Sequence, residues 1–296
     1  MRICYVLLSA TFGMHQYTAD LANRMVARGH SAHLVTTARY PGDRYSPEIQ
    51  VDTPIQSQGT GLSFRAIDRQ SVHKAIGSIG EAAPDVVHIT GPHIWNPLVL
   101  AALRRLAIPV VHTLHDLDPH PGTIYGPLLY LWNRAVARLA DHILVHAERY
   151  RDRVVRMGLL PSKVSCTPLL HLFLGHTWLD QLEHLTDNVV YGPAALFFGR
   201  LERYKGIDRL LTAWAMLRKD VRDRFVLLLA GSGSLDRVWE GTVPPGVQVR
   251  SGLINDAEAI ELFRTCALLV LPYSGASQSA LIPAAYFFHK PVIVST

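Results

Sequence analysis

Short apolar runs alternate with amphipathic stretches along almost the whole chain. Near the start, residues 2–8 and 32–36 are mostly apolar, and a helical pattern at 17–28 lies between them, after a loop through Gly13. A strand, a helix and a second strand in this order form a βαβ unit, whose two strands are parallel. Runs without polar residues are typical of parallel strands that are covered on both faces. The pattern therefore predicts an α/β fold.

The same alternation predicts two sets of elements separated by an irregular segment. The first set adds strands at 85–89, 109–113 and 142–146 and helices at 97–106 and 125–140. The second set has strands at 195–198, 225–229, 247–250, 268–271 and 291–295 and helices at 206–218, 257–266 and 281–288. A chain of 296 residues is long enough for about two domains. We therefore expect two Rossmann-like domains, at 1–170 and 188–296, joined by a linker at 171–187 and facing each other across a cleft.

Two cations stand where the first strand of the second set gives way to a helix. Arg200 and Lys205 lie within the segment from Gly199 to Gly206. In open α/β folds, ligands bind at the carboxyl ends of strands, and helix N-termini attract phosphate groups. An arginine fork and a lysine charge at such a place suit a diphosphate. A solvated basic loop is the alternative that the segment alone leaves open.

The composition narrows the class of protein. The net charge of +5 is modest and arginine outnumbers lysine, which favours anionic small molecules or a lipid surface over nucleic acid as partners. No apolar run approaches the ~20 residues that span a bilayer, and the first one is better interpreted as a buried strand than as a signal peptide. Cys4, Cys166 and Cys266 are far apart and odd in number, which indicates neither a disulfide framework nor a zinc site. We expect a cytoplasmic protein.

The order of five motifs along the chain resembles that of a known family. They are the loop with Gly13, the His115-Asp116 pair, Gly199-Arg200-Leu201 followed by Lys205-Gly206, Ala230-Gly231-Ser232-Gly233, and Leu271-Pro272-Tyr273-Ser274 ahead of Lys290-Pro291. On these motifs the chain is identified as a member of the retaining, nucleotide-sugar-dependent glycosyltransferases of the GT-B architecture, the family 4-like glycosyl transferases group 1. The resemblance covers nearly the whole chain.

The resemblance implies roles for individual residues. Arg200 and Lys205 are expected to bind the donor diphosphate and stabilise the departing nucleotide, which fixed cations can do without a metal or another cofactor. His115 is expected to contact the transferred sugar, although a purely structural role is the alternative in a chain with 15 histidines. His120 is the candidate on the acceptor side. The donor-binding candidates are Gly13, Gly199, Gly231, Ser232, Ser277, Gln278, Ser279 and Leu281.

Two departures from the family pattern stand out in the second half. The family carries two glutamates after the Leu-Pro-Tyr-Ser strand, and the corresponding positions here are Ser277 and Ala285. The family also continues with further helices where this chain closes at Thr296, so we expect an incomplete second domain. Both departures favour, as an alternative function, a catalytically degenerate binding or scaffold protein of the same fold.

The resemblance implies transfer of a hexose from a UDP- or GDP-linked sugar to a glycan, lipid-linked or small-molecule acceptor, with retention of configuration, as in polysaccharide biosynthesis. A nucleotide-sugar epimerase of similar fold is a further alternative. Residues 128–138 combine apolar bulk with arginines, and such a helix can lie on an anionic membrane surface. An ordinary helix that faces the core is the alternative for this stretch. Peripheral association with the inner face of the cytoplasmic membrane is therefore part of the expectation.

Overall fold

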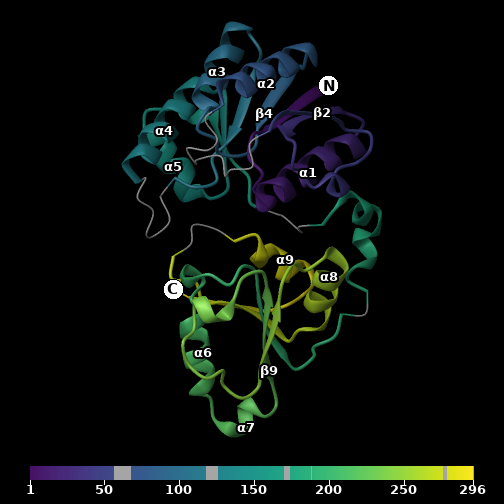
Figure 1. Cartoon of the computed structure of the whole chain (residues 1–296), viewed down its shortest axis with the longest axis vertical. Helices are drawn as coiled ribbons and strands as arrows, with labels where there is room; N and C mark the ends of the chain where they lie inside the picture. The colour runs from purple at the N-terminus through teal and green to yellow at the C-terminus, as the bar shows by residue number, and fades with distance from the viewer. Residues whose placement is uncertain (57–67, 118–125, 170–173, 188, 276–278, 296) are drawn as a thin grey trace. The chain divides into compact units, whose positions relative to one another are not determined.

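A computed structural model describes residues 1–56, 68–117, 126–169, 174–187, 189–275 and 279–295. The chain forms two compact units, of which the first comprises Met1–Leu169 with Phe173–Leu179 and the second Leu170–Leu172 with Asp180–Thr296. Each unit is a parallel sheet with helices packed on it (Figure 1). The predicted α/β class with two Rossmann-like units is confirmed.

The first unit has a sheet of seven strands in the order β3-β2-β1-β4-β5-β6-β7, and every pairing is parallel. The chain runs outward from β1 in one direction and then crosses to β4 on the other side, which is the doubly wound order. The strands are β1 Arg2–Leu7, β2 Ser31–Thr37, β3 Gln50–Ile55, β4 Val86–Ile89, β5 Val110–Thr113, β6 His142–Val145 and β7 Val164–Cys166.

Helices cover both faces of this sheet. They are α1 Phe12–Ala27, α2 Arg69–Glu81, α3 Asn96–Arg105, α4 Gly126–Leu139 and α5 Glu148–Arg156. Successive residues of a strand point to opposite faces. Ile3 and Tyr5 of β1 accordingly pack in one core cluster with α1, whereas Cys4 and Val6 pack in another with α2 to α5.

The sequence pattern did not predict four elements of the first unit. β3 is an edge strand of sequence QVDTPI, in which polar residues and a proline interrupt the apolar run. α5 carries arginine around most of its surface and buries only Tyr150 and Val154. α2 and the short edge strand β7 were missed as well. The predicted irregular linker was also wrong in part, because His176–His184 forms a 3₁₀ helix.

The second unit has five strands in the order β10-β9-β8-β11-β12, again all parallel. The strands are β8 Ala194–Phe198, β9 Val226–Gly231, β10 Val247–Ser251, β11 Leu268–Leu271 and β12 Val292–Val294. The helices are α6 Ile207–Ala215, α7 Lys219–Arg222, α8 Asp256–Thr265 and α9 Leu281–Phe287. The single helix predicted at 206–218 is therefore shorter, and α7 follows it.

The core of the second unit combines aromatic rings with one buried lysine. The Phe263 ring of α8 lies 5.4 Å from that of Phe198 and 5.7 Å from that of Phe288. Lys290 is only 1% exposed; its Nζ donates to the Val190 carbonyl oxygen at 2.5 Å and lies 4.5 Å from the centre of the Tyr191 ring. The ring and the carbonyl oxygen together offset the free-energy cost of removing the ammonium group from water.

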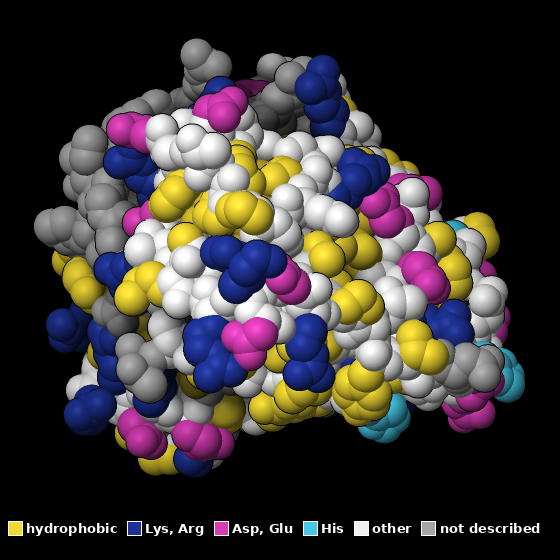
Figure 2. Space-filling view, turned by 90° about the horizontal axis from the view of Figure 1, so that it is seen from below, with side chains coloured by type: hydrophobic (Ala, Val, Ile, Leu, Met, Phe, Trp, Pro, Cys, Tyr) yellow, Lys and Arg dark blue, Asp and Glu magenta, His cyan; other side chains and the backbone are white. Residues whose placement is uncertain are grey.

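One cavity lies in the first unit and one apolar hollow in the second. The cavity, of about 510 Å³, lies at the amino ends of β1 and β2, and its lining includes the polar residues His30 and Glu48. An apolar hollow of about 570 Å³ lies against α6, with Trp214 and Val270 in its wall. In Figure 2 hydrophobic side chains lie at the surface among side chains of both charges.

Within the described ranges, no helix has the length and apolar character needed to cross a membrane.

Candidate functional site

The carboxyl ends of four strands in the second unit form one continuous edge. The Gly199 amide after β8 donates to Ala230 O of β9 at 2.9 Å, and the Leu201 amide donates to Ser232 O at 2.7 Å. Further along, Gly252 after β10 donates to Gly231 O at 3.0 Å. The loop after β11 joins the same edge, because the Ser274 amide donates to Tyr204 O at 2.9 Å. The predicted donor-binding positions Gly199, Gly231 and Ser232 are thus brought together.

Two glycines allow these loops to approach each other. Gly206 has φ +67°, and a Cβ atom there would lie 1.9 Å from Pro272 O. Gly231 has φ +148°, and a Cβ atom there would lie 2.0 Å from Gly199 O. Both positions need a backbone conformation that favours glycine and also leave no room for a side chain. The glycines therefore serve close packing of backbone against backbone.

Arg200 and Lys205 both lie on this edge, at the N-terminal side of α6. The Arg200 side chain is exposed; its Nη1 donates to Glu202 Oε1 at 2.7 Å and its Nη2 to Tyr204 Oη at 3.4 Å. The Lys205 Nζ lies 3.9 Å from the centre of the Tyr273 ring and 5.2 Å from that of Tyr204. Burial, followed by the charge of Arg200, lowers the pKa of Lys205 to about 8. The loop thus carries an exposed arginine in an ion pair and a lysine that contacts aromatic rings.

The remaining donor-side candidates are Ser277, Gln278, Ser279 and Leu281, of which Leu281 is the first residue of α9; Ala285 stands where the family has its second glutamate. Ser279 precedes α9, and its Oγ accepts a hydrogen bond from the Leu281 amide at 3.4 Å. Ser277 and Gln278 lie outside the described residues. Ala285 is fully buried in α9, so this position presents no side chain at the surface of the site.

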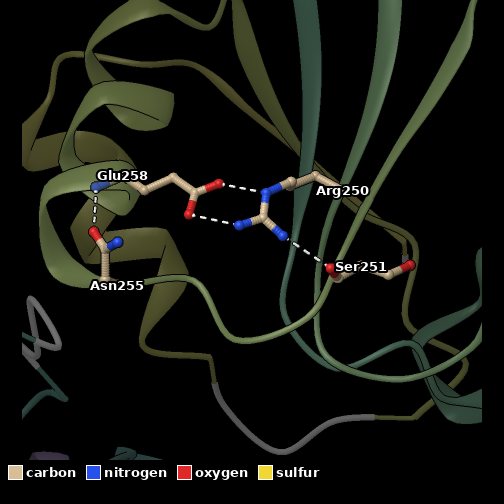
Figure 3. A network of polar contacts seen from close by, with 4 residues as sticks. All are labelled: Arg250, Ser251, Asn255 and Glu258. Atoms are coloured by element: carbon tan, nitrogen blue, oxygen red, sulfur yellow. Dashed lines mark hydrogen bonds and ion pairs between the residues drawn. The ribbon is translucent and has the colours of Figure 1, made fainter.

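A charge pair fixes the loop after β10. Arg250 at the end of β10 pairs with Glu258 of α8, with Nε and Oε1 2.8 Å apart and Nη2 and Oε2 3.1 Å apart (Figure 3). Arg250 Nη1 also donates to Ser251 O at 2.8 Å, and Asn255 Oδ1 accepts a hydrogen bond from the Glu258 amide at 2.9 Å. This bidentate pair and the helix cap hold both ends of the loop, on which Leu253 is 75% exposed.

His115 follows β5 in the first unit and lies in a cluster of rings. Its Nε2 donates to Thr90 O at 2.8 Å, and its ring lies 4.8 Å from that of Tyr17 and 5.1 Å from that of His146. Burial, with a smaller contribution from His146, lowers the pKa of His115 to about 4. The imidazole is therefore neutral near pH 7 and can act as a hydrogen-bonding group without a charge.

The loop position predicted for Gly13 was wrong. The hydroxyl groups of Ser9 and Thr11 share a hydrogen bond of 2.8 Å, and the amides of Met14 and His15 donate to Thr11 O. These bonds start α1 at Phe12, so Gly13 lies in the first turn of the helix. It remains close in sequence to the carboxyl end of β1, and a Cβ atom there would contact nothing within 4 Å. His120 lies outside the described residues.

Sequence reasoning assigned no role to three residues that contact the candidates. Tyr273 belongs to the Leu-Pro-Tyr-Ser motif, but its contact with Lys205 depends on the packing of two loops that are distant in the sequence. Tyr17 and His146 flank His115. His146 directly follows β6 and His115 lies two residues after β5, and this similar position at neighbouring strand ends is the signal that could have paired them.

Among the described residues, no three His, Cys, Asp or Glu side chains gather to hold a metal ion. The sequence has an Asp-x-Asp pattern at Asp116 and Asp118, of which Asp118 lies outside the described residues. The absence of a metal requirement thus stays a prediction.

We predict that Gly206→Ala destabilises the second unit by about 2 kcal/mol or more, because the new methyl group meets Pro272 O as well as requiring a left-handed backbone. Chemical denaturation measures the change. Gly29→Ala is the matched control, since Gly29 has φ +79° with open space around it. An equal loss in both variants would show that the contact with Pro272 is unimportant.

We also predict that acid destabilises the first unit between about pH 6.5 and 4. The pKa values of His112 and His115 are lowered from 6.5 to about 3 and about 4, mainly by burial. The unfolded chain therefore takes up protons first as the pH falls, and each group removes up to about 1.4 kcal/mol of stability per pH unit. Hydrogen exchange of peptides from residues 1–169 measures this loss. His115→Gln should flatten the pH dependence, and an unchanged slope would argue against a buried neutral imidazole.

Comparisons with known proteins agree with this architecture. A D-inositol 3-phosphate glycosyltransferase of Catenulispora acidiphila is 23% identical over 311 residues, which cover 96% of this chain and 74% of that protein. Among solved structures, Anabaena Alr3699/HepE in complex with UDP and glucose is similar with a TM-score of 0.66 and 16% identity, over 99% of this chain and 80% of that one. The UDP-GlcNAc 2-epimerase of Neisseria meningitidis bound to UDP-GlcNAc also has a TM-score of 0.66, with 14% identity and 99% and 82% coverage.

Family models match both units. Residues 12–169 match the glycosyl transferase 4-like domain, and residues 192–296 match the glycosyl transferases group 1. The first match alone covers more than half of the chain, and it contains His115 and the ring cluster, while the second contains the edge with Arg200 and Lys205. The chain therefore belongs to the glycosyl transferase 4-like family and is a glycosyltransferase of the GT-B fold.

Proposed function

We propose that this protein transfers a hexose from a UDP- or GDP-linked sugar to an acceptor hydroxyl, with retention of configuration and without a metal. The observation that carries the proposal is the placement of Arg200 and Lys205 at the carboxyl edge of the second sheet, where α6 begins. A diphosphate suits this place because two cations and the start of a helix act on it together. We assign the donor to the domain at 188–296, the acceptor to that at 1–170, and the linker to 171–187.

The chemistry requires charge stabilisation at the leaving group. The acceptor oxygen forms a bond to the anomeric carbon as the bond from that carbon to the phosphate oxygen breaks. Negative charge then grows on the departing diphosphate, and Arg200 and Lys205 stabilise it. The acceptor attacks on the face that the diphosphate leaves, and its proton passes to the leaving phosphate oxygen. No protein nucleophile is needed.

The choice of donor and acceptor rests on relatives as well as on the site. The similar structures of HepE contain UDP, glucose or UDP-glucose, which supports a uridine nucleotide sugar for this chain. The relatives named D-inositol 3-phosphate glycosyltransferase favour the small-molecule class of acceptor over a glycan or a lipid-linked one. In the first domain, we propose that the neutral His115 binds a hydroxyl of the transferred sugar, that Gly13 belongs to the donor-binding residues, and that His120 serves the acceptor side.

We predict that Arg200→Ala and Lys205→Ala each weaken UDP binding about 10- to 100-fold and abolish transfer, because each removes one charge-assisted contact with the diphosphate. Calorimetry with UDP and GDP and a panel of nucleotide sugars in a thermal-shift assay provide the measurements. Arg218→Ala is the matched control, since Arg218 pairs with Asp220 beside α7 rather than on the site.

Normal turnover in both site variants would refute the diphosphate assignment. Binding of nucleotide sugars without transfer to any acceptor would favour the degenerate binding protein. An epimerised nucleotide sugar formed without an acceptor would favour the epimerase, a function that some of the similar structures carry in their names.

We further propose that the protein associates with the inner face of the cytoplasmic membrane through α4. Leu128, Tyr130 and Leu131 on this helix are 56%, 45% and 67% exposed. Arg134 and Arg138 on the same helix are exposed too, and arginines recur along α5. Apolar side chains next to cations suit a surface of anionic lipids.

We predict that Leu128→Ser combined with Leu131→Ser weakens sedimentation with phosphatidylglycerol vesicles about tenfold, because apolar area no longer enters the lipid surface. Leu253→Ser, a change at a residue of the second unit that is 75% exposed, is the control and should have no effect. Equal binding by all variants, or equal binding to phosphatidylcholine vesicles, would contradict membrane association through α4.

A further inference from the structure

The Lys205 ammonium is held by aromatic rings rather than by a carboxylate. Its Nζ lies 3.9 Å from the centre of the Tyr273 ring and 5.2 Å from that of Tyr204. Among the described residues, no carboxylate lies within ion-pair distance of this nitrogen. The negative face of a ring attracts a cation, and the attraction is larger where water is excluded. Tyr273, which is only 8% exposed, is the closer of the two rings.

Tyr273 is itself fixed by the segments around it. The Ser295 hydroxyl after β12 donates to the Tyr273 carbonyl oxygen. The amide and hydroxyl of Ser274 both donate to Tyr204 O, at 2.9 and 3.0 Å. Gly206 packs directly on Pro272 O. The loop that carries Lys205 and the loop that carries Tyr273 are thus joined on both sides of the ammonium group.

We propose that Tyr273 is a positioning residue for glycosyl transfer: its ring holds the Lys205 ammonium at the carboxyl edge of the second sheet before an anionic ligand arrives. The catalytic meaning of this contact rests on the proposed function, whereas the contact itself does not. A cation held in place in advance does not have to be ordered when the ligand binds, which lowers the free-energy cost of binding.

The charged and titratable groups that face Lys205 are few. Arg200 disfavours and Glu202 favours the protonated amine, and both belong to its own loop. From the β11 side the neighbour is Tyr273, whose own pKa burial raises to about 12, so that its ring stays neutral. Burial of the amine lowers the Lys205 pKa to about 8, while an attractive ring raises it. Removing the ring without admitting water must therefore lower this pKa further.

The proton equilibrium of Lys205 can be measured directly. The chain has five lysines, Lys74, Lys163, Lys205, Lys219 and Lys290, so a carbon–proton correlation spectrum of the protein with ¹³C-labelled lysine has few signals. Lys205→Arg identifies the Lys205 signal by its disappearance. Titration of that signal is then compared in the wild type, Tyr273→Phe and Tyr273→Leu. The buried Lys290 in the same unit reports whether packing is preserved.

We expect Tyr273→Phe to keep the Lys205 pKa near 8 and Tyr273→Leu to lower it by about 0.5 to 1.5 units, because leucine keeps the apolar cover and loses the ring. Should Tyr273→Leu disturb the fold, replacement of Tyr273 by pentafluorophenylalanine keeps the shape of phenylalanine and reverses the charge distribution of its ring. A Lys205 pKa that is the same with phenylalanine, leucine and the fluorinated ring would overturn the proposal.

Binding of UDP separates this inference from the proposed function. If UDP binds the wild type, Tyr273→Leu should weaken binding about tenfold while Tyr273→Phe leaves it within about twofold. A ring-dependent Lys205 pKa in a protein that binds no nucleotide would support the positioning contact and refute the diphosphate site. A nucleotide affinity and a Lys205 pKa that are both independent of the ring would refute the positioning role and leave the proposed function intact.

Discussion

The second unit depends on one constraint, the approach of backbone to backbone at the carboxyl edge of its sheet. Gly206 lies against Pro272 O and Gly231 against Gly199 O, at distances that only a residue without a Cβ atom can reach. Because the main chains of these loops are in contact, the backbone that carries their side chains is fixed. The backbone positions of Arg200 and Lys205 therefore depend on the close packing at Gly206 and Gly231.

The candidate groups of the two units differ in charge. In the second unit the functional candidates are cations near the surface, one of them against rings. In the first unit, burial keeps His115 uncharged, and its hydrogen bond to Thr90 O fixes its orientation. Charge compensation suits a diphosphate, whereas a neutral imidazole suits the hydroxyl groups of a sugar. This division supports a donor phosphate on the second unit and neutral groups of the substrates on the first.

The sequence predicted most buried strands, because a short apolar run between helices is typical of a strand buried on both faces of a parallel sheet. It did not predict β3 or α5, in which polar residues mask the buried positions. The order of motifs also predicted that Arg200 and Lys205 share a sheet edge. Their surroundings could not be predicted, since Tyr204 and Ser274 are 70 positions apart and meet only through the pairing of β8 with β11. The local sequence pattern thus specifies the strands and helices, whereas contacts between distant residues depend on how the strands pair.

The ion pair between Arg200 and Glu202 has a consequence for any anion that arrives at the site. Arg200 already holds a carboxylate at 2.7 Å, whereas Lys205 faces uncharged rings. A ligand that takes the place of this carboxylate gains from Arg200 only the difference in free energy between the two ion pairs. An anion with a single weak charge gains little from that exchange, and one with several charges gains more. Under the proposed function, Glu202 would therefore compete with the donor diphosphate for Arg200.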